Sequence, residues 1–369
     1  MKRDHIRRLA DTRTPSSETS CTAGGTMRKS DRQLLRLALA VAVVAGGFVA
    51  MENRAWGDDR DRITILEEND GLFFNSDKHY TQGFRISDLH PVTAPGFWNG
   101  AFDLLGSVAP IFAPGGNRQE SLFLGQSIFT PKNTQLRPPD PRDRPYAGWL
   151  YFGSSLLQET QGRMLENFEL DLGIVGPGAL AKQVQNDFHQ FIGTDTAKGW
   201  SNQLQTEFGA VLSYERKWRQ PLLGDTGFGI DIIPQAGASV GNIFTYGEIG
   251  SLLRIGKGLG ADYGPARIRP ALSGTDYFDE RGLDGGRGFY FFVGAQGRAV
   301  AHNIFLDGNT YRTSRSVPKK NFVGDLQAGF SASWSKSLRL DVSVVLRSQE
   351  FRGQRGTDDI CTAALTFTW

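Results

Sequence analysis

Long stretches of the chain alternate strictly between apolar and polar residues, and this pattern limits the possible folds more than any other feature. Between Phe168 and Ile174, every second residue is apolar, and Glu169 and Asp171 stand among the residues between them. A period of two residues is typical of a β-strand with two different faces. Strands of soluble sheets usually have ~5–6 residues, whereas the alternation here extends over ranges such as 203–219 and 337–351. Long strands with one apolar and one charged face are typical of a transmembrane β-barrel.

The alternation predicts an all-β fold, a transmembrane antiparallel β-barrel of about twelve strands, and bacterial single-chain barrels have an even number. One segment, "GALAKQVQNDFHQFIG", has apolar residues at helical spacing and predicts a short amphipathic helix within an extracellular loop. The last strand ends on Trp369, and such an ending resembles the assembly signal of Gram-negative outer-membrane proteins. The expected strands cover residues 62–70, 79–89, 119–129, 145–160, 163–175, 203–219, 227–240, 244–257, 286–302, 321–335, 337–351 and 358–369.

Residues 1–57 are expected to be an N-terminal extension and signal peptide that is removed, and residues 58–369 the barrel domain. Basic residues precede an apolar run from Leu37 to Ala50, which is shorter than the ~20 residues of a transmembrane helix. The sequence Ala55-Trp56-Gly57 then provides a small-x-small cleavage site. The alternative is a single N-terminal anchor helix.

Composition excludes several classes of protein. The formal net charge is only +2, whereas nucleic-acid binding depends on a large basic surface, so we expect no nucleic-acid partner. After residue 57 no stretch approaches ~18 consecutive apolar residues, which excludes a helical membrane protein. Cys361 is the one cysteine of the expected mature chain, so no disulfide forms within it.

The stretch "ENDGLFFNSDKHYTQGFRIS", residues 68–87, reads as two strands joined by a tip that is crowded with polar groups. If both chain ends lie in the periplasm, the connections after the first, third and fifth strands lie on the extracellular side. Asn69, Asp70 and Thr81 then share a rim with Arg137 and with His189 of the predicted helix. Strand parity places Thr81 on the inward face of the barrel.

A basic residue, a carboxylate, an amide and an imidazole at one barrel mouth form a plausible hydrolytic site. His189 would activate a water molecule, and a metal or another cation would stabilise the oxyanion. Asn69 and Asp70 offer hard oxygen ligands, which suit calcium better than zinc. Glu207 points inward near the rim and is a third candidate metal ligand, with Asp77 as the alternative. In the simpler reading, the Asn-Asp pair forms a turn and the histidine is structural.

The chain resembles the outer-membrane lipid A 3′-O-deacylase family. The motifs are "ENDGLFFNSDKHYTQGFRIS", "GIVGPGALAKQVQNDFHQFIG", "DRPYAGWLY" and "GWSNQLQTEFG". The resemblance implies a calcium-dependent hydrolase that removes the 3′-linked acyl (acyloxyacyl) chain from lipid A of lipopolysaccharide. It implies His189 as general base, Asn69 and Asp70 in the metal and oxyanion region, and Thr81 lining the site. The family's Lys-Arg pair corresponds here to Arg137 alone, with Lys132 as the weaker candidate.

From this resemblance we expect a monomer in the bacterial outer membrane that acts on lipopolysaccharide. Two alternatives belong to other classes. One is a non-catalytic barrel, either a narrow pore or a surface-binding protein, although the charged lumen residues are expected to pair and fill the interior. The other is an outer-membrane phospholipase, which would use similar groups on a different ester.

Overall fold

The computed structural model describes residues 61–70, 78–92, 97–224, 227–271, 276–283 and 285–369. The expected signal peptide and cleavage site in residues 1–57 lie outside these ranges, as does Asp77. Within these ranges, no helix is long and apolar enough to cross a membrane.

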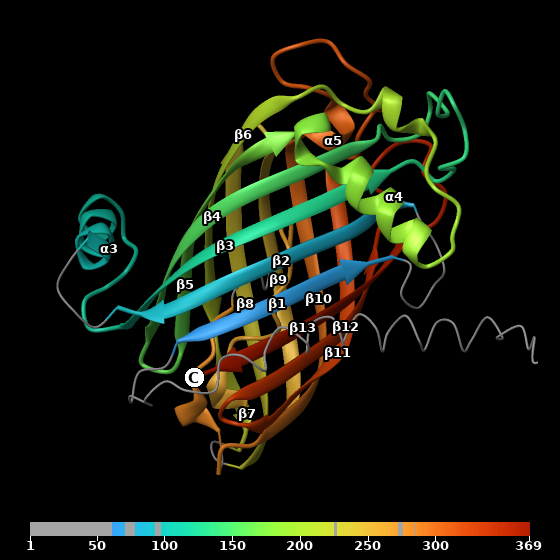
Figure 1. The fold of residues 1–369 in the computed structure, drawn as a ribbon. Helices are drawn as coiled ribbons and strands as arrows, with labels where there is room; N and C mark the ends of the chain where they lie inside the picture. The colour runs from blue at the N-terminus through green and yellow to red at the C-terminus, as the bar shows by residue number, and fades with distance from the viewer. Residues whose placement is uncertain (1–60, 71–77, 93–96, 225–226, 272–275, 284) are drawn as a thin grey trace, which may run out of the picture.

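Twelve long antiparallel strands of the described chain form a closed barrel (Figure 1), as predicted. Each strand pairs with its neighbour, and the pairs β1–β13 and β6–β8 complete the ring. A thirteenth, short strand, β7 (Gln220–Leu223), pairs only with β8. The barrel strands are β1 (Arg62–Asn69), β2 (His79–Pro91), β3 (Asn117–Thr130), β4 (Ala147–Thr160), β5 (Met164–Val175), β6 (Glu207–Trp218), β8 (Phe228–Gly241), β9 (Phe244–Lys257), β10 (Gly288–Asn303), β11 (Phe322–Ser335), β12 (Leu338–Arg347) and β13 (Asp358–Thr368).

Side chains along each strand alternate between the lumen and the lipid-facing surface. On β5, Glu169 and Asp171 are 1% and 6% exposed, whereas Leu170 and Leu172 are each 40% exposed. The charged side chains therefore face inward and the apolar ones outward, as the alternation predicted. Hydrocarbon solvates charged groups poorly, so this orientation is the stable one in a membrane.

The two ends of the barrel differ. The N–H of Trp369 donates to the carbonyl of Asp61 at 3.1 Å, so the two ends of the described chain meet. Helices α4 (Ala181–Phe191) and α5 (Ile304–Asp307) lie at the opposite end (Figure 1). Because long loops of outer-membrane barrels are extracellular and the turns periplasmic, the end with α4 and α5 is the extracellular one.

Some elements differ from the sequence prediction. β6 begins at Glu207 rather than at 203, because Gly199–Asn202 forms a 3-10 helix and the N–H of Leu204 donates to the carbonyl of Tyr146 at 2.9 Å. Helix α3 (Phe97–Val108) was not predicted. It has no acidic residue in its first turn and no basic residue in its last. Phe102 of α3 packs in an apolar cluster on the outside of the barrel at its periplasmic end.

The connection between β9 and β10 folds back into the lumen. Arg269 donates from Nε to Glu169 at 2.7 Å and from Nη2 to Glu215 at 3.3 Å. Closer to the extracellular end of the barrel, the backbone N–H of Ile268 donates to Oε1 of Glu68 at 3.2 Å. The sequence "GPARIRP" lies between the expected strands 244–257 and 286–302, and its spacing does not reveal charged partners on distant strands. This lumen segment, residues 262–271, fills the interior with paired charges.

We expect the substitution Arg269→Met to destabilise the barrel strongly. The change removes the cation that the buried Glu169 and Glu215 share, and leaves Arg85 at 3.9 Å from Glu169 and Lys217 at 3.5 Å from Glu215. Breaking a buried ion pair costs ~3–5 kcal/mol. The temperature at which the barrel loses its compact migration on a gel should fall. Arg281→Met is the matched control, because Arg281 belongs to the same connection but its side chain is 68% exposed. Equal melting of the two variants would contradict a structural role for Arg269.

Candidate functional site

Helix α4 carries the histidine that was predicted to act as general base. The helix follows a short 3-10 helix, Pro177–Ala179. Ala181, Gln185 and His189 are spaced four residues apart and are buried on one face of α4. Trp200 donates from Nε1 to Oε1 of Gln185 at 2.9 Å, so the segment after the helix also holds this face in place. The predicted helix is confirmed, and it is short and rigidly packed.

The buried face of α4 packs against the outside of the barrel wall. Ile128 of β3 precedes the lumen-facing Phe129, so Ile128 points outward, and it packs with Ala181 in one apolar cluster. Gly148 of β4 permits this contact, because a Cβ at that position would clash with the Cβ of Ala181. Glycine is therefore required where the helix approaches the wall most closely.

A hydrogen bond also joins the start of α4 to the outer face. Gln126 of β3 lies two positions before Ile128 and points outward like it. Its Nε2 donates to the carbonyl of Ala179 at 2.7 Å. In the view of Figure 1, α4 runs across the upper ends of β4 and β3 towards those of β2 and β1. His189 therefore lies on the lipid-facing side of the wall, at its extracellular end.

Thr81 lies on the same outer side because of a β-bulge. The pairing of β2 with β3 shifts between Tyr80 and Gln82, so Thr81 is an extra residue in its strand. Tyr80 packs in the lumen against Phe129, and Thr81 Oγ1 lies 2.7 Å from Oγ1 of Thr130, the outward neighbour of that phenylalanine. The prediction that Thr81 faces inward is therefore wrong, because the bulge reverses the alternation.

Asn69, the last residue of β1, also points outward. Glu68 before it faces the lumen, where it contacts the lumen segment, so Asn69 and Glu67 share the outer face. Gln82, paired with Asn69 across the two strands, donates to Oε1 of Glu67 at 3.0 Å. Polar side chains on a membrane-facing surface are costly and mark functional sites. The sequence analysis missed Glu67 and Gln82, although their position on the apolar face of a strand was a usable signal.

Asp70 lies where β1 ends and β2 begins. Its N–H is 3.5 Å from the carbonyl oxygen of Thr81. Its Oδ2 accepts a hydrogen bond from the backbone N–H of Lys78 at 2.6 Å, and the residue is 1% exposed. Asn69, Asp70 and Thr81, three of the predicted site residues, therefore adjoin one another at the extracellular edge of the wall.

A backbone carbonyl group orients the imidazole of His189. Its Nδ1 lies 2.7 Å from the carbonyl oxygen of Asp195, and the side chain is 6% exposed. Because a carbonyl only accepts, Nδ1 carries the hydrogen, and the lone pair of the neutral ring is on Nε2. The loop after α4 thus fixes the tautomer and leaves Nε2 as the basic nitrogen.

A network of polar side chains holds the rim from the inside. His79, the first residue of β2, places Nδ1 2.6 Å from Oδ1 of Asp358 and Nε2 3.6 Å from Oδ1 of Asp143. Burial alone would raise the pKa of Asp143, but the nearby imidazole of His79 and hydrogen bonds from two backbone N–H groups hold that pKa below its usual value. The network ties β2 to β13 and to the β3–β4 connection, so it supports the strand on which Thr81 lies.

Two arginines of the β3–β4 connection have different environments. Arg137, the predicted cation, is exposed. Arg144, which the sequence analysis did not single out, is fully buried: its Nη1 lies 3.2 Å from Oε2 of Glu350, and its guanidinium lies over the ring of Phe129 at 4.7 Å. Arg144 belongs to the "DRPYAGWLY" motif, which leads into the fourth strand. This position was the available signal that Arg144 lies near the rim.

We expect the two arginines to respond differently to substitution. Arg144→Ala should lower the melting temperature, because it removes the cation 3.2 Å from the buried Glu350 and leaves Arg347 at 3.9 Å. Arg137→Ala should leave melting unchanged and, if this exposed cation contacts the substrate, raise KM, with Lys132→Ala as the matched control for a lost surface charge. Melting curves and kinetics on the purified protein measure both effects. Identical behaviour of Arg137→Ala and Lys132→Ala would remove Arg137 from the site.

Glu207 does not join the group around Asp70. Its Oε1 accepts from the N–H of Thr310 at 3.1 Å, and its Oε2 accepts from Nδ2 of Asn309 at 3.1 Å. It faces inward on β6, which is five strands from β1 in the sheet order, at ~4.8 Å per strand. The prediction of Glu207 as a metal ligand shared with Asn69 is therefore corrected, because the two residues lie on opposite faces of distant strands.

In the described ranges, no three His, Cys, Asp or Glu side chains lie close enough to bind one ion. Calcium also accepts amide and backbone carbonyl oxygens and water. The carboxylate of Asp70 and the amide of Asn69 fit such a site in the chemistry of their donor atoms. A calcium site at this edge would therefore combine carboxylate oxygen from Asp70 with amide, backbone carbonyl or water oxygens.

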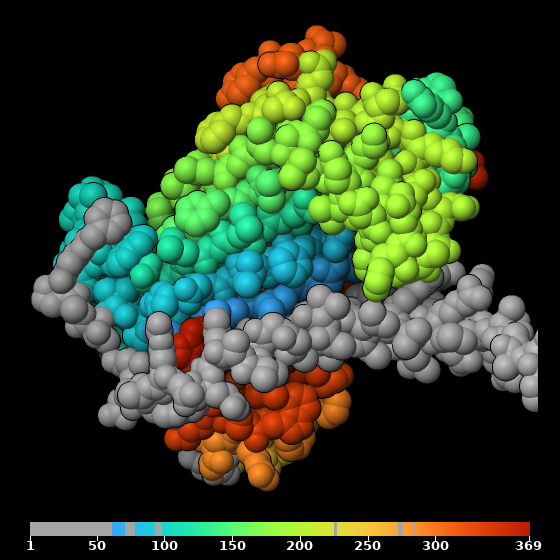
Figure 2. Space-filling model, viewed as in Figure 1, coloured from blue at the N-terminus to red at the C-terminus, as the bar shows by residue number. Residues whose placement is uncertain are grey.

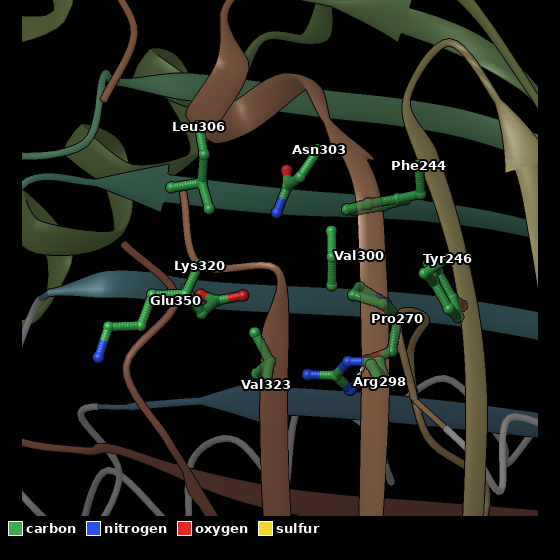
Figure 3. Close-up of a pocket in the computed structure, with 10 residues that line it drawn as sticks. All are labelled: Phe244, Tyr246, Pro270, Arg298, Val300, Asn303, Leu306, Lys320, Val323 and Glu350. Carbon is green, nitrogen blue, oxygen red and sulfur yellow. Dashed lines mark hydrogen bonds between the residues drawn. The ribbon is translucent and has the colours of Figure 1, made fainter. Parts of the chain in front are cut away.

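A small pocket inside the barrel is a less suitable site for a membrane lipid. It lies between Pro270 of the lumen segment and Leu306 of α5 (Figure 3). The barrel wall separates it from the lipid-facing surface. The pocket is lined by Phe244, Tyr246, Pro270, Arg298, Val300, Asn303, Leu306, Lys320, Val323 and Glu350.

Comparisons with known proteins agree with this architecture. The family model described as "Outer membrane protein LpxR" matches residues 35–369. No curated protein sequence matches the chain. Among solved structures, LpxR from Salmonella typhimurium has a TM-score of 0.68 and 19% identity, covering 83% of this chain and 99% of that one. The β domain of the Bordetella autotransporter BrkA has a TM-score of 0.42 and 11% identity, covering 84% and 99%.

The match to the LpxR structure confirms the predicted barrel, and the family match confirms the predicted outer-membrane location. The family match spans the opening hairpin, α4 and the closing strand, which are the segments that carried the resemblance in the sequence. The chain belongs to the LpxR family of outer-membrane proteins.

Proposed function

We propose that this protein is a carboxylic ester hydrolase that removes the 3′-linked acyl or acyloxyacyl chain from lipid A in the outer leaflet. The observation that carries the proposal is the position of His189, whose imidazole is oriented on the lipid-facing side of the wall at its extracellular end. Lipid A occupies the outer leaflet, so its esters approach this side of the barrel rather than the lumen. Membership of the LpxR family supports the same function.

In the proposed mechanism, Nε2 of His189 removes a proton from a water molecule, and the water oxygen bonds to the ester carbonyl carbon. The carbonyl π electrons move to its oxygen and form an oxyanion. When these electrons return, the bond from the carbonyl carbon to the sugar oxygen breaks. The proton on Nε2 passes to that oxygen, so the products are a fatty acid and a sugar hydroxyl.

The residues at the end of β1 have distinct proposed roles. Asn69 and Asp70 would hold calcium, which supplies positive charge for the oxyanion when it is bound. Thr81 lines the outer wall beside them, and the exposed Arg137 contacts a phosphate of the substrate. We also propose that the protein acts as a monomer, because the ring of strands closes within one chain.

The alternatives are less well supported. Ion pairs between the lumen segment and the barrel wall occupy the interior, which disfavours a passive pore. A phospholipase would use the same oriented histidine on another ester, so chemistry at His189 does not separate the two enzymes. The substrate does.

Mass spectrometry of lipids from cells with and without the protein tests the proposal. We expect lipid A to lose its 3′-linked chain only when the protein is present, and glycerophospholipids to remain intact. Lysophospholipid formation with unchanged lipid A would favour the phospholipase. If neither lipid changed when a folded barrel was present in the outer membrane, the proposed hydrolase would be refuted.

A further inference from the structure

Helix α4 has an exposed apolar face that does not pack against the barrel wall. Leu180 precedes the helix, and three further apolar residues follow it at intervals of four, four and three positions. Residues at this spacing lie on one side of a helix. We call this set the α4 stripe; its members and exposed fractions are Leu180 (49%), Val184 (38%), Phe188 (47%) and Phe191 (70%).

The α4 stripe is unusual for a helix surrounded by water. Large apolar side chains are rarely exposed in one continuous line on a water-facing surface. The remaining exposed face of α4 is polar and includes Lys182, Asp187 and Gln190. α4 therefore has one face against the wall, one polar face and one apolar face, and the last is typical of helices that lie at a membrane surface.

The α4 stripe continues the lipid-facing surface of the barrel. Gly178, in the turn before the helix, lies against outward-facing Ile174, since a Cβ on Gly178 would be 2.9 Å from Cδ1 of that residue. Leu172 and Leu170 follow on the same face of β5, and each is 40% exposed. Figure 2 shows the yellow-green region that includes α4 as a ridge on the outside of the wall. The helix thus begins where the lipid-facing surface ends.

We propose that the α4 stripe is immersed in the hydrocarbon of the outer leaflet and holds His189 at the depth of the lipid ester groups. Interfacial helices bury their apolar face ~5–10 Å into the boundary between headgroups and acyl chains. His189 follows Phe188 directly and lies on the adjacent face, so immersion of the stripe fixes the height of the imidazole. The inferred membrane contact depends only on the exposed apolar residues of α4 and of the barrel wall. Its catalytic purpose rests on the proposed function.

Spin-label accessibility tests the immersion. Phe191→Cys and Gln190→Cys variants would each carry a nitroxide in protein reconstituted into phosphatidylcholine vesicles. In protein that begins at Asp58, Cys361 is the one native cysteine and it is buried, so labelling is directed to the new residue. We expect the label at 191 to relax faster with oxygen than with a water-soluble nickel chelate, and the label at 190 to show the reverse. Preferential access of the nickel chelate to both positions would overturn the proposal.

Kinetics test the purpose of the immersion. For the double variant Phe188→Ser and Phe191→Ser, we expect KM for vesicle-embedded lipid A to rise about tenfold, because two rings lose their contact with hydrocarbon. With detergent-dispersed lipid A, kcat should stay within about twofold of the wild type. Gln190→Ser is the control and should change neither value. An equal loss of kcat on both substrates would show that the stripe does not act through the membrane. If the wild type hydrolysed no lipid A, the proposed function would fail, while the spin labels would still decide the immersion.

Discussion

The substitution His189→Asn should lower ester hydrolysis by about two orders of magnitude or more, because general-base catalysis contributes roughly 10²–10⁴-fold. The amide nitrogen of asparagine can still donate to the carbonyl of Asp195, the bond that Nδ1 makes at 2.7 Å. The variant therefore keeps the contact that orients the side chain and loses only the basic Nε2. Release of fatty acid from purified lipid A in detergent, measured by mass spectrometry, gives the rate.

His302→Asn is the matched control for this prediction. His302 lies at the extracellular end of β10, with Nε2 2.9 Å from the carbonyl oxygen of Asn242, on the far side of the barrel from α4. Its replacement should leave the rate nearly unchanged. Heat-modifiable migration of both variants would show that the barrels are intact. Near-native hydrolysis by a folded His189→Asn protein would make His189 a structural residue and would remove the central group of the proposed mechanism.

The barrel was predictable because each strand carries its own signal. In strands such as β5, lipid and lumen impose opposite preferences on neighbouring positions, so the period of two is visible without knowledge of the partners. Helix α4 was predictable for a similar reason, since its wall-facing and stripe residues recur at helical spacing. Helix α3 was missed although its apolar residues, among them Trp98, Ala101, Phe102, Leu105 and Val108, also recur at helical spacing. The two glycines within this segment, Gly100 and Gly106, weaken the local preference for a helix.

For the candidate site, the shared location of several residues was predictable, but the direction of individual side chains was not. Asn69, Asp70 and His189 were expected at one extracellular rim, and the structure places them there. The outward direction of Thr81 depends on a bulge, and a single extra residue leaves no mark in the spacing of apolar positions. The position of Glu207 and the path of the lumen segment depend on contacts between residues far apart in the chain. Local patterns do not contain that information.

Calcium should be required for hydrolysis, and Asp70→Asn should raise the calcium concentration needed for half-maximal activity. Asp70 is the one carboxylate of the Asn69-Asp70 pair, so its replacement removes the negative charge that attracts a cation. The amide oxygen of asparagine can still accept the hydrogen bond that Lys78 donates at 2.6 Å, so the turn should keep its shape. We expect a shift of about tenfold or more, since one lost charge contact is worth at least ~1.4 kcal/mol when it is buried.

The measurement is the rate of lipid A deacylation in detergent after treatment with a chelator, followed by titration with calcium or magnesium. Calcium should restore the rate more fully than magnesium, which is smaller and releases its water reluctantly. Asp187→Asn is the control, because it removes an exposed carboxylate from α4 without touching the pair. If wild-type and Asp70→Asn proteins remained equally active in excess chelator, the Asn69-Asp70 pair would be a turn that shapes the rim, and the oxyanion would depend on protein groups such as Arg137 or Thr81.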